Sequence, residues 1–438
     1  MAKKIRLFSV VMAVIVLFTS CKGPILDVGN LLTPPVFFSE QNKIIDALKS
    51  SVGNEIELEY PSGGDYRSAF ILYDIDKDGS NEAIVFYRLV KPDMLQNMVH
   101  INLLDTKKGE WVSVCDIIGE ATSIDKVAVG TFLRKREILI GWNQIRDREK
   151  KLVCYSFNDG MLERDFETGY VEFAVSDFYG EAYGDELITV NYVPANENLN
   201  QVTQHARLIR CIDGEFKITS TTPLDIRVQG FRKCIAGKVN PAVKALFLDG
   251  IIDTNTINTQ VLIVSSNGKI TNPLLKDGKV NSLTERKSNL TTSDINLDGI
   301  LEIPRQEELL GYNEVPESER LYKTVWQTVS EGSLAVSSEM YIGSSIRVAF
   351  DSKSADKLTV KYTAARNELV FYEFNRSLEA SQNALFSVKV SEKELFEAEE
   401  GYHKIAENDY TVVTAKIINE QSPLALSLDR LEELVYII

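Results

Sequence analysis

The sequence has few residues of the kinds that build zinc or cysteine-dependent centres: five cysteines, three histidines and three tryptophans in 438 residues. The histidines His100, His205 and His403 lie far apart, and no two cysteines have CxxC spacing. The motifs G-x-S-x-G and H-E-x-x-H and the P-loop are also absent from the chain. These absences exclude the common hydrolase, metalloprotease and nucleotide-binding signatures, and we predict that the protein is not an enzyme.

Beyond the N-terminus the chain has no apolar segment long enough to cross a bilayer, which takes about 20 residues. An apolar stretch at 7–18 follows Lys3, Lys4 and Arg6, as in a secretory signal peptide. Removal of 1–20 takes away these three positive charges and changes the formal net charge from −15 to −18. Such a charge argues against binding to nucleic acid or to anionic lipid, and it favours binding of divalent cations.

Residues 18–21, Phe-Thr-Ser-Cys, resemble a bacterial lipobox, in which small residues precede a cysteine that becomes diacylated. Leucine is usual where Phe18 stands. The resemblance implies a signal peptide at 1–20 and lipidation of Cys21. It also implies an extracytoplasmic location on the outer face of the cell membrane, or on the outer membrane of a two-membrane bacterium. Residues 22–38 are rich in Gly and Pro, as expected of a tether. An ordinary signal peptide with an incidental cysteine is the alternative.

Four cysteines remain after Cys21, and three of them lie inside runs that look like strands. We interpret them as buried free thiols, although one disulfide is the alternative outside the cell. The four are Cys115, Cys154, Cys211 and Cys234.

After a short helix predicted at 39–51, the chain changes to runs with period two and frequent turn residues, which predicts a mainly-β fold. One unit recurs: an apolar strand, an Asp/Gly loop, and a second strand that begins near a Glu. The loops start near residues 74, 133, 177, 249 and 294. Further strand pairs follow the first two copies at 98–118 and 151–170. Four strands per unit at a spacing of roughly 45–70 residues are typical of β-propeller blades.

The loops at 74–82 and 294–302, with their flanking strands, resemble the FG-GAP or VCBS repeats of integrin-α-type propellers. The resemblance covers about 66–335 and implies a β-propeller of five to seven blades. The middle copies lack the Asp residues of these two loops. The predicted organisation is a signal peptide (1–20), a lipidated cysteine with tether and short helix (21–65), the propeller (66–335) and a small α+β C-terminal domain (336–438). In the last domain we predict a helix that begins at 391–394 and a final helix capped by Ser427.

The two loops place oxygen ligands at alternate positions before a glycine, a pattern that suits calcium, which takes six to eight oxygens at about 2.3–2.6 Å. We therefore predict Ca²⁺ as a structural cofactor. The first set comprises Asp74, Asp76, Asp78, the Ser80 carbonyl and Glu82. The second comprises Asp294, Asn296, Asp298, the Ile300 carbonyl and Glu302.

Two other interpretations of these loops compete with this one. An EF-hand would need flanking helices and a Glu at position twelve, where Val85 and Arg305 stand, so we reject it. Solvated Asp/Gly turns without metal are the second alternative, because such turns are common. Against them, three carboxylates at alternate positions repel one another when no cation lies between them.

Taken together, the sequence predicts a non-enzymatic, membrane-anchored surface lipoprotein. Its calcium-stabilised propeller would serve as a binding or scaffold module for an envelope protein or glycan, with no nucleic-acid partner. The alternative is an envelope carbohydrate-active enzyme or peptidase whose site no motif reveals. Turnover that is lost on changing an acidic residue outside the two loops would favour the alternative.

Overall fold

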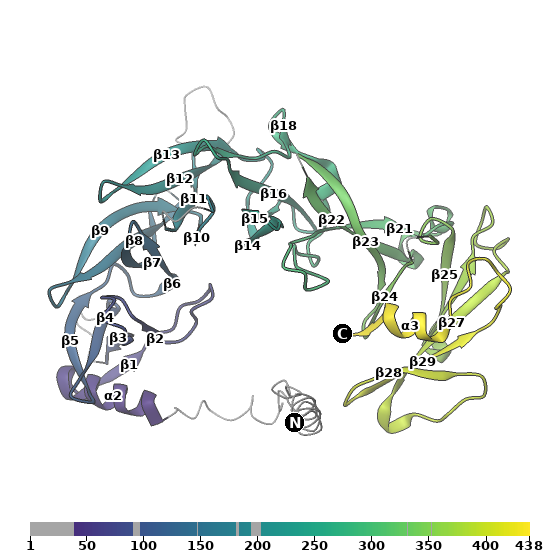
Figure 1. The fold of residues 1–438 in the computed structure, drawn as a ribbon, viewed down its shortest axis with the longest axis horizontal. Helices are drawn as coiled ribbons and strands as arrows, with labels where there is room; N and C mark the ends of the chain where they lie inside the picture. The colour runs from purple at the N-terminus through teal and green to yellow at the C-terminus, as the bar shows by residue number, and fades with distance from the viewer. Residues whose placement is uncertain are drawn as a thin grey trace, which may run out of the picture.

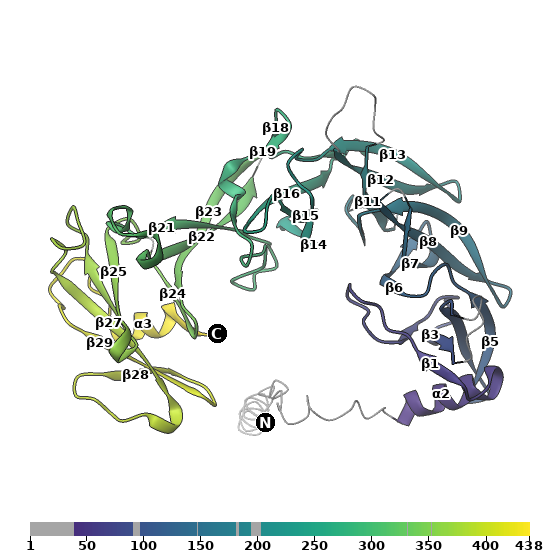
Figure 2. The same cartoon turned by 180° about the vertical axis from the view of Figure 1, so that it is seen from behind.

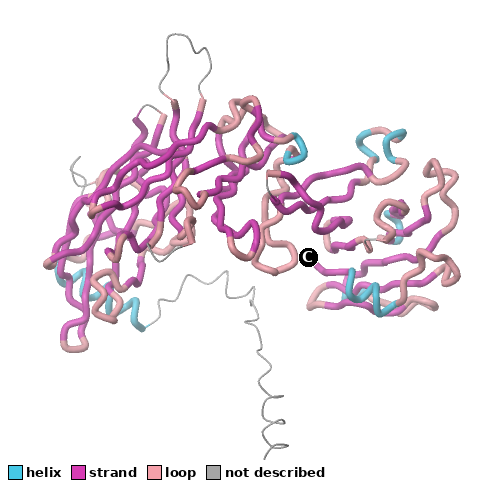
Figure 3. The backbone as a smooth tube through the Cα atoms, turned by 45° about the horizontal axis from the view of Figure 1, so that its top comes forward, coloured by secondary structure: helices cyan, strands magenta, loops and turns pink. Residues whose placement is uncertain are grey.

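The computed structural model describes residues 39–90, 97–146, 148–180, 184–193, 203–330, 332–351 and 353–438. The fold is mainly β, with successive antiparallel sheets joined by short connections (Figure 3). The sheets follow one another along an arc, and the first and last sheets stand apart at its two ends (Figures 1 and 2). The predicted lipobox and tether lie outside the described residues.

Three sheets in the first half have the same plan, in which four strands pair in chain order. Sheet 1 has β1 in addition, and β1 and β2 both pair with β3. The strands of sheet 1 are β1 (Ile56–Leu58), β2 (Phe70–Tyr73), β3 (Glu82–Leu89), β4 (His100–Lys107) and β5 (Glu110–Ile118). Those of sheet 2 are β6 (Ile124–Phe132), β7 (Lys135–Arg146), β8 (Glu149–Asn158) and β9 (Met161–Tyr170). Those of sheet 3 are β10 (Glu172–Ser176), β11 (Glu186–Tyr192), β12 (Gln204–Ile212) and β13 (Glu215–Pro223).

In the second half, sheets 4 and 5 continue the plan with additions at the sheet edges, where β20 joins β16 and β30 joins β24. In sheet 6 the strand order is β25-β26-β27-β29-β28. Sheet 4 contains β14 (Gly230–Asn240), β15 (Val243–Ile251), β16 (Thr256–Val264), β17 (Ile270–Thr271) and β20 (Arg286–Lys287), and β18 (Leu275–Lys276) and β19 (Lys279–Val280) form a separate hairpin. Sheet 5 contains β21 (Ile303–Glu308), β22 (Tyr322–Ser330), β23 (Ser333–Ile342), β24 (Ile346–Ala349) and β30 (Val435–Ile437). Sheet 6 contains β25 (Leu358–Thr363), β26 (Glu368–Glu373), β27 (Ala384–Glu392), β28 (His403–Glu407) and β29 (Thr411–Ile417).

The α-helices of the described part are α2 (Ser39–Val52) and α3 (Leu428–Leu434), and short 3₁₀ helices occupy some connections. The Ser427 hydroxyl accepts a hydrogen bond from the Arg430 amide at the start of α3, as predicted. Helix α2 packs Ile44 and Leu48 against sheet 1 and so covers the outer face of the array. The 3₁₀ helices span Ser282–Thr284, Tyr312–Glu314, Glu317–Glu319, Ala364–Arg366 and Lys393–Leu395.

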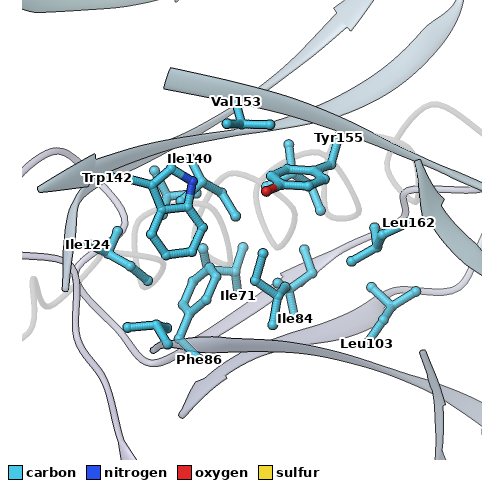
Figure 4. Close-up of a cluster of buried hydrophobic side chains, with 14 of the residues drawn as sticks. Ile71, Ile84, Phe86, Leu103, Ile124, Ile140, Trp142, Val153, Tyr155 and Leu162 are labelled. Atoms are coloured by element: carbon cyan, nitrogen blue, oxygen red, sulfur yellow. The ribbon is translucent and has the colours of Figure 1, made fainter. Parts of the chain in front are cut away.

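Alternate residues of a central strand face opposite neighbours, which explains how stacking buries both faces of a sheet. In β7, Ile138 and Ile140 pack against sheet 1, whereas Leu139 packs against sheet 3. Figure 4 shows the first of these interfaces, with Phe86 of sheet 1 facing Trp142 of sheet 2. The period-two pattern of the sequence therefore corresponds to a stack of sheets.

The hairpins between the third and fourth strands of sheets 1, 2 and 3 use the same turn. In each, two successive residues have positive φ and the second is a glycine, as type I′ turns require. The pairs are Lys108-Gly109, Asp159-Gly160 and Asp213-Gly214.

The predicted domain boundaries need correction. The division at 335/336 falls inside β23, and β30 returns from the chain end to pair with β24 of sheet 5. Strand β1 places part of the predicted 21–65 segment in sheet 1. The helix predicted from 391 is wrong, because Ser391 pairs with Val412 in the sheet and only a 3₁₀ turn follows. Long-range strand pairing overrides the local capping signal there.

Candidate metal centre

The first predicted calcium loop connects β2 to β3, and the second precedes β21. Strands, not helices, follow both loops, in agreement with the rejection of an EF-hand. The two backbones have the same conformation at two key positions. Lys77 and Leu297, at position four, have φ of 67° and 61°, and Gly79 and Gly299, at position six, have φ of 95° and 85°.

The same hydrogen bonds hold both loops. In the first, Asp76 Oδ1 accepts from the Asp78 amide (3.0 Å) and Asp78 Oδ1 accepts from the Ser80 amide (2.7 Å). The shared backbone and bonds identify the two segments as copies of one structure. The equivalent bonds of the second loop run from Asp298 N to Asn296 Oδ1 (3.1 Å) and from Ile300 N to Asp298 Oδ1 (2.8 Å).

The glutamate that ends each loop is fully buried, and one of its oxygens has no partner. Glu82 and Glu302 are both 0% exposed. Their Oε2 atoms accept from the amides of Ile75 (2.7 Å) and Ile295 (3.0 Å), whereas no described residue hydrogen-bonds to either Oε1 atom. Burial, together with the charges of Asp76 and Asp78, raises the pKa of Glu82 to about 7, and burial also raises the pKa of Glu302. Leaving a buried carboxylate oxygen unpaired is costly, and either a bound cation or protonation offsets that cost.

In the first loop the side chains converge. Carboxylate oxygens of Asp74, Asp76 and Asp78 all lie within 4.8 Å of one another, a distance compatible with one shared ion. Asp74 Oδ1 is buried and has no partner among the described residues, and Asp74 Oδ2 lies 2.7 Å from Arg136 Nη1. The hydrogen bond from Arg136 lowers the pKa of Asp74 and keeps it ionised. Since Arg136 belongs to sheet 2, this bond also joins the loop to the neighbouring sheet.

In the second loop the side chains fold onto their own backbone. Asp294 accepts from the amides of Asp298 (3.1 Å) and Gly299 (2.8 Å), and Asn296 Nδ2 donates to Asp298 Oδ2 (3.0 Å). Within the described residues, three such carboxylates come together only in the first loop. The second loop therefore has the backbone of a metal loop, but its side chains must turn inward to bind an ion.

Three middle copies were also predicted, and none of them forms such a loop among the residues the structure describes. The second is a two-residue turn, in which Leu133 and Arg134 have φ of 45° and 78°, too short to surround an ion. In the third, Asp177 Oδ1 accepts from the Gly180 amide (2.7 Å), and residues 181–183 lie outside the described part. The fourth copy was placed wrongly, because Asp249 lies within β15, the second strand of its sheet.

Asp249 instead forms a buried ion pair in sheet 4. Its Oδ1 lies 2.7 Å from Arg286 Nη2, and both side chains are at most 1% exposed. Thr292 donates to the same carboxylate through its amide (2.8 Å) and its hydroxyl (2.7 Å). This aspartate is fully paired and has a structural role.

The glutamate at the start of the second strand recurs in sheets 2 and 3. Glu137 and Glu186 are 1% and 2% exposed, as buried as Glu82 and Glu302. Burial and the neighbouring Asp165 carboxylate raise the pKa of Glu137 to about 9, so its carboxyl group is protonated at neutral pH. The glutamates were visible in the sequence as part of the repeat. Their partners were not, because they come from other strands.

Another polar cluster that the sequence did not reveal lies on sheet 1. His100 Nδ1 lies 3.1 Å from Asp116 Oδ1, and Asp116 Oδ2 accepts from Tyr87 (2.6 Å) and Asn102 (2.7 Å). Ser113 accepts from Asn102, so no described contact makes it a nucleophile activated by the histidine. The cluster satisfies buried polar groups of three neighbouring strands.

All four cysteines after Cys21 are free thiols in the structure. Cys154 is buried, and the other three are partly exposed. Burial raises the pKa of Cys234 to about 12, which leaves this thiol unreactive at neutral pH.

None of the helices in the described part is both long and apolar enough to cross a membrane.

Comparison with known proteins gives only distant similarities. No family model and no curated protein matches the sequence. Among solved structures, the chain is similar to the exotype rhamnogalacturonan lyase YesX, with 12% identity, 73% of this chain and 62% of the lyase covered, and a TM-score of 0.29. The periplasmic gluconolactonase PpgL of Pseudomonas aeruginosa gives 10% identity over 76% of this chain and 95% of that protein, at a TM-score of 0.26. A Dyadobacter fermentans protein of unknown function gives 8% identity over 83% of this chain and 98% of that protein, at a TM-score of 0.29. Similarities this distant say nothing of what the chain binds or catalyses.

Proposed function

We propose that the protein is a non-enzymatic, lipid-anchored surface protein whose β-propeller-like array of sheets is stabilised by Ca²⁺. The array would serve as a rigid platform that binds an envelope protein or glycan. The observation that carries the metal assignment is the convergence of the Asp74, Asp76 and Asp78 carboxylates in the loop that ends at the buried, unpartnered Glu82 Oε1. Glu302 Oε1 is unpartnered at the same place in the second loop.

The residues of the first loop fit a calcium ion. Asp74, Asp76 and Asp78 supply oxygens that already converge. Glu82, whose Oε1 is buried without a partner among the described residues, would add one from the start of β3. The carbonyl of Ser80 is the expected fifth protein ligand. The ion would neutralise several carboxylates at once and hold the loop against sheet 2, where Arg136 binds the first of them. Its role is thus structural.

Titration of the full chain with calcium tests the metal assignment. We expect two calcium ions per chain, with dissociation constants on the order of 10⁻⁴–10⁻³ M, as in extracellular sites. Asp78→Asn and Asp298→Asn, at the same position of the two loops, should each remove one ion, as isothermal titration calorimetry can count. A wild-type chain that takes up no calcium at millimolar concentration would contradict the proposal.

The lipid anchor at Cys21 is tested in cells. The variant Cys21→Ser should move the protein from the membrane fraction to the soluble fraction, because the acylated thiol is lost. The variant Cys115→Ser is the matched control, since Cys115 is a free thiol within sheet 1. Continued recovery of Cys21→Ser with membranes would refute anchoring through this residue.

A further inference from the structure

In sheet 3, Arg210 lies beside the buried glutamate Glu186. In sheets 1 and 5, one oxygen of the corresponding glutamate has no partner among the described residues. Arg210 lies on β12 next to Glu186, since Leu187 and Ile209 are register partners in the antiparallel strand pair. Arg210 Nε lies 3.7 Å from Glu186 Oε1, and the guanidinium lies over the Tyr179 ring, 4.9 Å from its centroid. Glu186 Oε2 accepts from the amides of Phe178 (2.9 Å) and Tyr179 (3.1 Å). Glu186 therefore repeats the bonds of Glu82 and Glu302, with a cationic side chain beside its second oxygen.

The corresponding positions of sheets 1 and 5 carry no positive charge. The register of β3 with β4 places Asp105 opposite Glu82, and that of β21 with β22 places Thr328 opposite Glu302. In both sheets the glutamate Oε1 has no described partner. The arginine is thus absent from the two repeats that have an Asp-rich loop and present in the third, which lacks one. The second repeat also lacks such a loop, but its Glu137 lies opposite Ser156 and is kept protonated by burial.

We infer that Arg210 supplies, in the third repeat, the positive charge that calcium supplies in the first and fifth, so that this repeat binds no metal. The inference rests on the proposed function, which says which loops bind calcium. It adds a reason why the third loop does not bind it. A guanidinium cannot leave the protein, so the third repeat is neutralised at any calcium concentration.

The surroundings of Arg210 show what its removal would expose. The side chain borders a cavity of about 280 Å³ that is also lined by Asp185, Glu186 and Asp213. Without the guanidinium, three carboxylates would surround a solvent-accessible space. A divalent cation is the ligand that such a space would then favour.

The test compares Arg210→Gln with Arg210→Lys in the full chain. In chelator, Arg210→Gln should lower the melting temperature by about 3 °C or more, and Arg210→Lys should keep at least half of that stability, because it retains the charge. About 5 mM calcium should raise the melting temperature of Arg210→Gln more than that of the wild type, and titration should count one more ion. Arg207→Gln is the control, because Arg207 lies on the same strand but bonds to His205.

Two results would overturn the inference. In the first, Arg210→Gln is as stable in chelator as Arg210→Lys and Arg207→Gln. In the second, Arg210→Gln is destabilised, but calcium raises its melting temperature no more than sodium chloride of equal ionic strength does. Arg210 would then stabilise the sheet only by packing over Tyr179. A wild type that binds no calcium is a separate result, and it refutes the proposed function. The third site is tested independently, because it is measured as the difference in the number of bound calcium ions between Arg210→Gln and the wild type.

Discussion

In about 5 mM calcium, Asp78→Asn and Asp298→Asn should each lower the free energy of unfolding by about 1–2 kcal/mol, and the double variant by about the sum. The magnitude follows from dissociation constants on the order of 10⁻⁴–10⁻³ M, since a ligand stabilises the folded state by RT ln(1 + [L]/Kd). The two loops belong to different sheets, so their effects should add. Each aspartate also accepts from a backbone amide two residues further on, that of Ser80 for Asp78 and that of Ile300 for Asp298, and asparagine can retain this bond through its carbonyl oxygen.

Chelator provides the internal control for this prediction. Wild type and double variant should have nearly the same stability when calcium is removed, and they should differ only when it is present. Asp253→Asn is the matched control, because Asp253 is exposed and accepts from the amides of Asn255 and Thr256 in its own turn, both at 2.9 Å. Equal losses of stability with and without calcium would show that the aspartates act as turn residues alone.

The second large effect concerns pH. Between pH 4.5 and pH 7, Glu137 should lower the free energy of unfolding of the wild type by up to about 3 kcal/mol. Glu137→Gln should abolish this decrease. Burial holds the pKa of Glu137 at about 9 in the folded chain, against 4.5 for the free group. Above pH 4.5 the unfolded chain releases this proton and the folded chain retains it, so stability decreases as the pH rises towards 9. Glutamine is neutral throughout and can keep the hydrogen bond to Asp165.

Urea unfolding at several pH values, in saturating calcium, measures this effect. Calcium is included because bound calcium would keep Glu82 and Glu302 ionised and so remove their own contribution to the slope. Glu110→Gln is the control, because Glu110 lies on the exposed surface of sheet 1. A pH dependence of Glu137→Gln that matches that of the wild type would show that Glu137 is ionised in the folded protein.

The sequence was most informative about the features that depend on local pattern. Period-two runs predicted the strands because residues such as Leu139 and Ile140 must face opposite neighbours. The Asp-rich loops were recognisable because all of their oxygens lie within nine residues. The cap of α3 is a local signal too, and Ser427, which precedes that helix, has the predicted bond.

The features that the sequence could not reveal depend on distant partners. Nothing near Asp249 shows that Arg286 neutralises it, and the fourth repeat was therefore assigned to the wrong strand pair. Arg136 and Arg210 likewise act on carboxylates of other strands. The return of β30 to sheet 5 brings together residues nearly 90 positions apart, which moves the predicted domain boundary.

Sheets 1 to 5 share one physical problem, which is a carboxylate buried in a stack of sheets. The first and fifth are suited to a cation, the second keeps Glu137 protonated, the third uses Arg210, and the fourth pairs Asp249 with Arg286. Each solution supplies positive charge or removes negative charge at the place where water is excluded. The central claim is that calcium performs this task in two of the repeats.

Crystals of the chain grown with calcium test that claim directly through an anomalous difference map. We predict one peak bounded by Asp74, Asp76, Asp78 and Glu82, a second within the loop that ends at Glu302, and none beside Arg210. A first loop without a peak at millimolar calcium, with the Glu82 carboxylate still unpartnered, would contradict the account.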